Sequence, residues 1–264
     1  MSAASGTLSV RAGAGEPLLR LARPVVGVAI FLIAAEALVS VLDLPVTTVP
    51  RPSVIAAEIA RAPSTYAGAV WRTFLESFLG FVAGGIFGVA TGVVFSRSRT
   101  LREMFLPLFV ISQTIPVIAF GSIIVLWFGN TLLAKGVIAF YLSFFPVTVN
   151  TLIGFRAVDP QQVALMRSFG ASEGQLLRRL FLPTALPQIF VALRLGAALS
   201  LVGAIVGEWF GDVTGLGVLL LQAMYNENYA ALWAAIVLSA VLGLALYGLV
   251  ALAERRIVFW GSEQ

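Results

Sequence analysis

Six apolar runs alternate with short polar segments along this chain of 264 residues. A helix needs about 20 apolar residues to cross a bilayer, and the runs come close to that length. They cover residues 24–42, 71–95, 105–128, 136–155, 188–209 and 230–253. The first run is too long for a signal peptide, and no small-residue cleavage site follows it. The pattern therefore predicts an all-α membrane protein of six transmembrane helices in one domain, residues 24–256. We expect a disordered tail over residues 1–23 and a short tail over residues 257–264.

Composition supports a chain that crosses the membrane several times. Hydrophobic residues make up 59% of it and charged residues only 11%, with a mean hydropathy of +0.97. Soluble domains carry about 25% charged residues. The net charge of +4 does not indicate nucleic-acid binding, because the arginines lie in short loops between apolar runs.

The arginines also predict the orientation, since cytoplasmic loops are enriched in basic residues. With six spans and both ends in the cytoplasm, only Arg51, Arg61 and Lys135 lie outside, Lys135 in a tight turn over residues 129–135. Arg72 and Arg194 lie near the borders. The remaining arginines all lie inside: Arg11, Arg20, Arg23, Arg97, Arg99, Arg102, Arg156, Arg167, Arg178, Arg179, Arg255 and Arg256. The predicted topology is N-in and C-in.

Two rows of glycines predict faces where helices approach closely. In the second run, glycine recurs every four residues at Gly80, Gly84, Gly88 and Gly92. In the fifth run, Gly203 and Gly207 belong to a similar face. We expect both rows to pack against neighbouring helices.

Two residues inside apolar runs are candidates to line a path or gate. Pro116 interrupts the third run, and proline breaks or kinks a helix because it has no backbone N–H. Such a break survives in lipid only where protein or a cavity covers it. Asn150 is polar in the middle of the fourth run and should face the bundle.

Missing residue types exclude several chemistries. The chain has no cysteine and no histidine, which excludes disulfides, Cys/His zinc sites and His-based catalytic triads. No GxxxxGK[ST] motif is present, so we expect no ATP site and no cofactor in this chain. Lys135, Asp43, Asp159 and Asp212 are expected in turns or loops, which argues against an intramembrane enzyme.

The polar interval over residues 159–187 is predicted to form two short helices. Asp159 followed by Pro160 is a favoured helix start, and Gly170 suits the left-handed residue that ends the helix. Ser172 and Gln175 fit a capping box at the start of a second, amphipathic helix, which we expect Pro183 to end. An amphipathic loop on the membrane surface is the alternative. The two caps and the glycine favour a rigid docking loop.

The spacing of this interval resembles a known motif. Gly170, nine residues and then Leu180-Phe181-Leu182-Pro183 are similar to the EAA loop of permease subunits in binding-protein-dependent ABC importers. The EAA triplet aligns with residues 164–166, where Ala164 replaces the glutamate. Segments 116–129, 145–159 and 207–217 also resemble one branch of that family, so the resemblance covers nearly the whole chain after residue 24. That branch imports nitrate, sulfonates, taurine and thiamine-precursor pyrimidines.

The resemblance implies a mechanism and partners. Two permease subunits, expected to be a homodimer, pair in the bacterial inner membrane. Separate subunits bind and hydrolyse ATP, a substrate-binding protein delivers a small nutrient, and the chain is not an enzyme. The segment around residues 172–181 would be the coupling helix. The implied coupling residues are Ala164, Gly170, Ala171, Ser172, Gln175, Leu176, Arg178, Arg179, Leu180 and Pro183. The sequence GEWFG…GLG in residues 207–217 resembles pyrimidine or riboflavin importers more than the other importers of this branch.

The acidic residues Glu208 and Glu36 lie within apolar runs. Glu208, at the outer end of the fifth run, is either an interface anchor or a contact for the docked binding protein or outer gate. Glu36, in the first run, either belongs to a gate or bonds to a partner, or its side chain reaches the membrane surface. The alternative function is an autonomous secondary carrier, which would show repeated halves and charged sites at mid-membrane.

Overall fold

The computed structural model describes residues 16–261, and these contain helices and no strand. The predicted all-α fold is confirmed. In chain order the elements are α1 (Glu16–Val41), α2 (Pro52–Arg61), α3 (Pro63–Arg97), α4 (Arg99–Ser112), α5 (Val117–Phe128), α6 (Leu132–Arg156), α7 (Pro160–Ser168), α8 (Glu173–Leu176), a π-helical turn η1 (Leu177–Phe181), α9 (Leu182–Glu208), α10 (Leu216–Tyr225), α11 (Tyr229–Ile257) and a 3-10 turn η2 (Phe259–Gly261).

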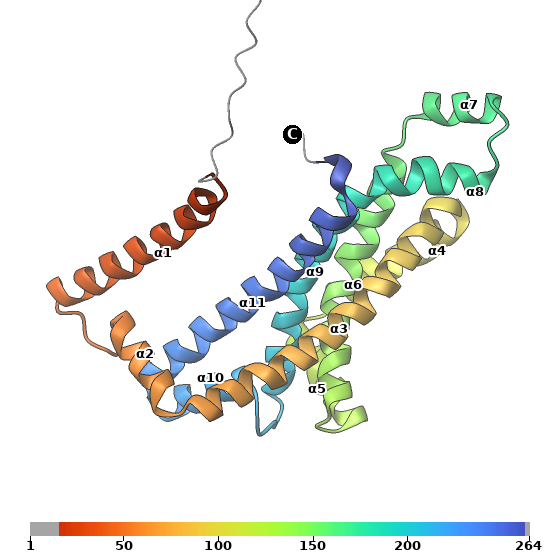
Figure 1. Cartoon of the computed structure of the whole chain (residues 1–264). Helices are drawn as coiled ribbons and strands as arrows, with labels where there is room; N and C mark the ends of the chain where they lie inside the picture. The colour runs from red at the N-terminus through yellow and green to blue at the C-terminus, as the bar shows by residue number, and fades with distance from the viewer. Residues whose placement is uncertain (1–15, 262–264) are drawn as a thin grey trace, which may run out of the picture.

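Helices α3, α6 and α9 form the centre of the bundle and contact one another along their lengths. Helix α11 packs on α9 and α10, and α5 lies against α6 and α9. Helix α1 stands apart and rests mainly on α2 (Figure 1). The core is therefore made by three long helices, with the others arranged around them.

Within residues 16–261, four helical stretches are long and apolar enough to cross a membrane: Pro63–Arg97, Leu132–Arg156, Glu173–Glu208 and Tyr229–Ile257. Helices α4 and α5 form a fifth span if the bent pair is counted as one, with 95° between them. The predicted break at Pro116 is confirmed, because Pro116 is the N-cap of α5. In α1 the apolar part, Val26–Val41, is shorter than a full span.

The two glycine rows face helix α6. A Cβ added to Gly88 would lie 2.7 Å from the Phe144 carbonyl oxygen, and one added to Gly92 would lie 2.8 Å from that of Thr148. Added Cβ atoms at Gly80 and Gly84 would likewise clash with α6. On α9, a Cβ at Gly203 would lie 2.7 Å from Ala139 Cα, and Gly207 faces Lys135. Glycine thus lets α3 and α9 pack backbone-to-backbone on the same central helix.

Two boundary predictions were wrong. Residues 16–23 belong to helix α1 and not to a disordered tail; residues 1–15 lie outside the described residues. The second span starts at Pro63, eight residues before Trp71, because proline suits a first helical turn. The start of α2 also bonds to α1, because the Ser53 N–H and hydroxyl donate to the Glu36 carboxylate, at 3.0 and 2.7 Å. Glu36 therefore ties α1 to the start of α2.

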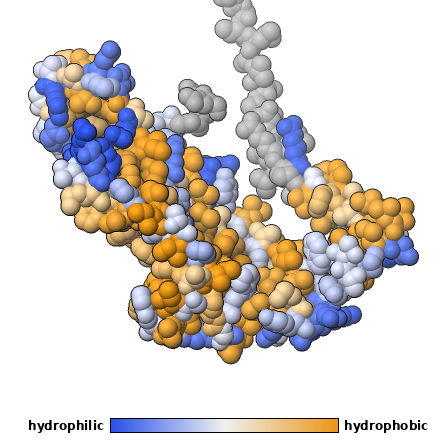
Figure 2. Space-filling view, turned by 180° about the vertical axis from the view of Figure 1, so that it is seen from behind, coloured by the Kyte–Doolittle hydropathy of each residue, from blue (hydrophilic) through white to orange (hydrophobic). Residues whose placement is uncertain are grey.

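The polar residues gather at the ends of the bundle. The first described residues of α1, the end of α11 and the α7–α8 pair lie at one end, whereas α2, α5 and α10 approach the other (Figure 1). Hydrophobic surface covers most of the region between the ends, and a hydrophilic patch marks the end that carries α7 and α8 (Figure 2). The helices thus present an apolar belt between two polar rims.

Candidate functional site

The interval between α6 and α9 is a helix–turn–helix with caps at each junction. Asp159 accepts the Gln161 N–H at 2.8 Å, at the start of α7. At its end the Gly170 N–H donates to Arg167 and the Ala171 N–H to Met166, with φ of +77° at Gly170, which is a Schellman motif. The predicted glycine turn is confirmed.

The predicted capping box is also present at the start of α8. Ser172 Oγ accepts the Gln175 N–H at 3.3 Å, and the Gln175 side chain accepts the Ser172 N–H at 2.8 Å. These bonds occupy N–H groups that a helix start otherwise leaves free. The turn between the two helices is therefore fixed by backbone and side-chain bonds together.

The prediction that Pro183 ends the second helix was wrong. The helix continues from Glu173 to Glu208 as one stretch. The π-helical turn η1 precedes Pro183, and the Leu182 N–H bonds to the Leu177 carbonyl. A proline inside a helix removes one backbone bond, and the π-helical turn changes the bonding pattern directly before Pro183. The second loop helix is thus the direct extension of the fifth apolar helix.

Most of the coupling candidates lie on the surface of this element. Ala164, Gly170, Ser172, Gln175, Arg178 and Arg179 are exposed, whereas Ala171, Leu180 and Pro183 are half-buried. Leu176 differs, because it is fully buried within the chain and cannot face a partner. Sequence reasoning missed Phe169, which is 82% exposed at the end of α7. The available signal was a large apolar residue next to the turn glycine.

Ionic contacts tie the element to the end of α3. Glu173 lies 2.7 Å from Arg167 and 3.7 Å from Arg97, and the Arg97 guanidinium lies 5.6 Å from the centre of the Phe181 ring. Exposed ion pairs contribute only about 0–1 kcal/mol each. They position the element more than they stabilise the fold.

The candidate path residues do not form one site. Pro116 is exposed at the α4–α5 bend. Asn150 donates to the Pro146 carbonyl at 2.8 Å and accepts from Gln188 at 2.9 Å. Asn150 therefore faces the bundle, where it joins α6 to α9.

Glu208 lies in a buried polar cluster at the other end of the bundle. It is 1% exposed, contacts Thr73 Oγ1 at 2.6 Å and accepts the Gly217 N–H at 2.5 Å. The side chain therefore has almost no accessible surface for a contact with a docked protein. Its bonds hold the start of α10 against α3 and α9.

Lys135 was expected in a turn and instead lies in the first part of α6, fully buried. Its ammonium is 2.8 Å from the Asp212 carboxylate, which is 7% exposed. Burial acts to raise the pKa of Asp212, but the bonds from Lys135 and the Val213 N–H, together with the charges of Lys135 and Arg72, outweigh it and hold that pKa below its ordinary value. The loop after α9 is therefore fixed to α6.

Breaking this buried pair should be costly. Removing one partner leaves an uncompensated charge, at about 3–5 kcal/mol. We expect Lys135→Ala to lower the melting temperature of the purified protein by roughly 10 °C or more. The double variant Lys135→Met/Asp212→Leu should recover much of the loss. A melting temperature unchanged in Lys135→Ala would contradict the role of the pair.

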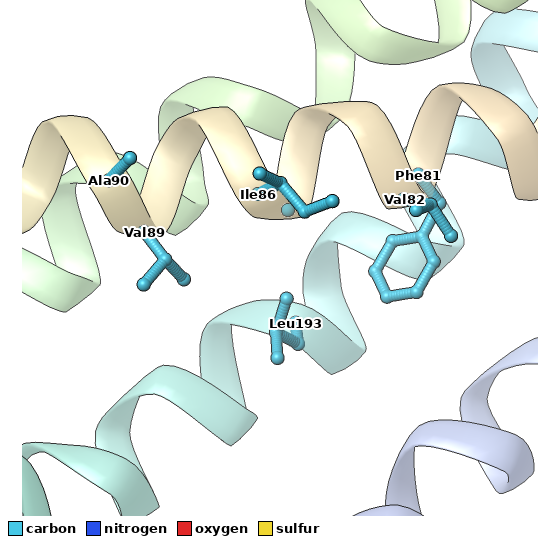
Figure 3. A pocket seen from close by; sticks show the side chains of 7 residues that line it. Phe81, Val82, Ile86, Val89, Ala90 and Leu193 are labelled. Atoms are coloured by element: carbon cyan, nitrogen blue, oxygen red, sulfur yellow. The ribbon is translucent and has the colours of Figure 1, made fainter.

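One hollow on the surface of the bundle is apolar. A groove of about 520 Å³ lies between α3 and α9, lined by Phe81, Val82, Gly85, Ile86, Val89, Ala90 and Leu193 (Figure 3). It contains no polar side chain that could orient a substrate. The structure therefore places no substrate-binding pocket in this groove.

Known proteins resemble the chain in sequence. A probable ABC transporter permease of Haemophilus influenzae is 32% identical, covering 87% of this chain and 94% of that protein. The formylaminopyrimidine transport permease of Halalkalibacterium halodurans is 33% identical over 70% of this chain and 74% of its own. The riboflavin transport permease of Chloroflexus aurantiacus is 31% identical, with 89% and 88% covered.

Solved structures share the fold. The inward-facing MetNI methionine ABC transporter matches with a TM-score of 0.62 and 20% identity, covering 75% of this chain and 96% of that one. An amino acid ABC transporter matches with a TM-score of 0.62 and 19% identity, covering 76% and 97%. The model of the family described as "Binding-protein-dependent transport system inner membrane component" matches residues 80–259. The chain belongs to this family and is the non-catalytic permease subunit of an ABC importer in the inner membrane, working with a separate ATPase and a substrate-binding protein.

Proposed function

We propose that this permease is driven through the element formed by α7, the Gly170 turn and α8–η1. The observation that carries the proposal is its construction: both helices are capped, the turn is a Schellman motif, and α8 continues without a break into α9. A rigid element that extends a membrane helix transmits a displacement to it. ATP binds to the partner subunit, and this chain needs no cofactor of its own.

The docking surface would combine charge and an apolar anchor. Arg178 and Arg179 are exposed on the second helix, and Phe169 projects beside the turn. Ala164, Gly170, Ser172 and Gln175 set the shape of the exposed edge. Buried aromatic anchors contribute most at protein interfaces, so we assign Phe169 that role. Leu176 supports the surface from inside.

The proposed topology is six crossings over residues 24–256, with both ends in the cytoplasm and the loop 156–187 on the same side. The α7–α8 end of the bundle carries Arg97, Arg102, Arg156, Arg178 and Arg256, whereas Arg51 and Arg61 lie toward the other end. The positive-inside rule supports this orientation. Helix α1 would complete the sixth crossing.

We propose that two identical copies assemble around the path. Helix α1 rests mainly on α2, and apolar side chains such as Phe31 and Ile33 are about 70% exposed. Helix α1 packs little on its own bundle, and a second copy would supply an apolar surface against which it can pack. Cross-linking of two differently tagged copies in membranes tests this.

Co-purification tests the coupling proposal directly. The permease should purify with the ATPase encoded beside it, and Gly170→Pro should lose that complex, because proline cannot adopt a positive φ. Gly174→Ala is the matched control, since its surroundings are open and its backbone is ordinary. If the Gly170→Pro variant is present in the membrane at normal abundance and still co-purifies with the ATPase, the proposal is contradicted.

The proposed cargo is a neutral heterocycle of the pyrimidine or riboflavin class. Two of the relatives described above are named for formylaminopyrimidine and riboflavin. The three basic side chains within the described bundle are each paired: Arg72 with Glu76, Lys135 with Asp212 and Arg194 with Glu254. None is left to attract an anion such as nitrate or a sulfonate.

Ligand screening of the neighbouring binding protein tests the cargo. We expect thermal stabilisation by pyrimidine or flavin ligands and none by nitrate, taurine or alkanesulfonates. Stabilisation by the anions alone would contradict the assignment while leaving the permease function intact.

A further inference from the structure

The buried polar cluster beside α10 holds more acids than bases. Glu76 accepts a bond from Arg72 at 2.8 Å, and Asp212 pairs with Lys135 at 2.8 Å. Glu208, from α9, has no cation left as a partner among the described residues. Its neutral bonding partners are the Thr73 hydroxyl and the Gly217 N–H, and its carboxyl group also lies against that of Glu76.

The Thr73 hydroxyl has too few hydrogens for its contacts if Glu208 is ionised. Thr73 Oγ1 lies 3.0 Å from the Ala69 carbonyl and 2.6 Å from Glu208 Oε1, and it accepts the Leu216 N–H at 2.9 Å. A threonine hydroxyl has one hydrogen and two lone pairs. If Glu208 is ionised, the one hydrogen must serve two acceptors, and one of these contacts has no hydrogen.

A proton on Glu208 Oε1 completes the pattern. The carboxyl O–H then donates to Thr73 Oγ1, and the Thr73 hydrogen is free to bond the Ala69 carbonyl. The second carboxyl oxygen, Oε2, is the carbonyl that accepts the Gly217 N–H. Each contact at Thr73 and at Gly217 then has one donor and one acceptor.

The surrounding charges favour the same state. Glu208 is 1% exposed, and an isolated buried carboxylate is strongly disfavoured. The nearby Glu76 carboxylate also repels a second negative charge. The start of α10 attracts an anion, but Gly217 supplies only a single direct N–H bond to Oε2. With one proton on Glu208, the remaining charges of the cluster form two neutral ion pairs, Arg72–Glu76 and Lys135–Asp212.

We propose that Glu208 is a proton-holding site: a neutral carboxyl group that bridges Thr73 of α3 to Gly217 and so anchors the start of α10. The site binds one proton and does not depend on which nutrient is carried or on the coupling element. Arg72, Glu76, Lys135 and Asp212 are the charged groups that face it from α3, α6 and the loop after α9.

Paired amide substitutions test the site, because glutamine reproduces a neutral carboxyl but not an ionised one. In the purified full-length permease in lipid nanodiscs, Glu208→Gln should change the melting temperature by less than about 2 °C. Glu76→Gln, the matched control, removes the carboxyl group that accepts the Arg72 bond and should lower the melting temperature by about 5 °C or more. A loss in Glu208→Gln as large as in Glu76→Gln would overturn the proposal.

Infrared spectroscopy measures the protonation of Glu208 directly and does not depend on the stability of the variants. The wild type should show the carbonyl stretch of a protonated carboxylic acid, shifted by 13C-labelled glutamate. That band should be absent in Glu208→Gln and retained in Glu76→Gln. An unchanged acid band in Glu208→Gln, or no acid band in the wild type, would contradict the assignment.

Discussion

Replacing Gly203 with leucine is expected to eliminate the folded permease from the membrane. An added Cβ there would lie 2.7 Å from Ala139 Cα and 2.8 Å from the Ile138 carbonyl oxygen. Both are backbone atoms of α6 and cannot rotate away. Overpacking a core costs about 1–3 kcal/mol and sometimes more, and here α9 must move off α6 along its length. Against a total stability of about 5–15 kcal/mol, we expect at least about a tenfold loss of membrane abundance.

The matched control is Gly248→Leu, on α11. An added Cβ at Gly248 meets nothing within 4 Å, and leucine favours a helix over glycine. Abundance and melting temperature should equal or exceed those of the wild type. Equal loss in both variants would show that leucine is harmful for a reason other than the α6–α9 contact.

Reversing the charge of Arg178 and Arg179, the two exposed arginines of the coupling element (α7, the Gly170 turn and α8–η1), should stop ATP-driven uptake. In Arg178→Glu/Arg179→Glu the bundle should fold normally, because neither side chain makes a contact in the core. Like charges facing each other at an interface cost several kcal/mol, which corresponds to about 100-fold weaker docking or more. Uptake by proteoliposomes containing the complex should fall to the level without ATP.

The control for this prediction is Arg255→Glu/Arg256→Glu at the end of α11. These arginines are also exposed and lie at the same end of the bundle. The control has the same change in charge, so it reports any effect on membrane insertion. Loss of uptake in both double variants would assign the effect to insertion and contradict a specific role for Arg178 and Arg179.

Local signals in the sequence predicted the caps and the turn of the helix–turn–helix between α6 and α9. Caps, capping boxes and turn glycines depend on neighbours within a few residues, so Asp159, Ser172, Gln175 and Gly170 could be interpreted from spacing alone. The break at Pro116 was predictable for the same reason. The glycine rows predicted close packing but not the partner, because spacing does not identify the helix that approaches.

Features that depend on distant contacts were mispredicted. Lys135 looked like a turn residue because its charge suggested exposure, and only Asp212, 77 positions later, explains its burial. Glu208 looked like a surface contact, yet it bonds to Thr73, 135 positions earlier. Pro183 suggested a helix end because proline usually stops a helix, and the π-helical turn before it could not be foreseen from composition.

Site-specific cross-linking tests the central claim most directly, because the chain has no cysteine of its own. Arg179→Cys places a single thiol on the coupling element, and Val213→Cys places one at the opposite end, where Val213 is 84% exposed. Each variant would carry a thiol-attached photocrosslinker in membranes that also contain the ATPase. The account predicts a permease–ATPase adduct from position 179 and none from position 213. An adduct from position 213 alone would place the ATPase at the wrong end and contradict it.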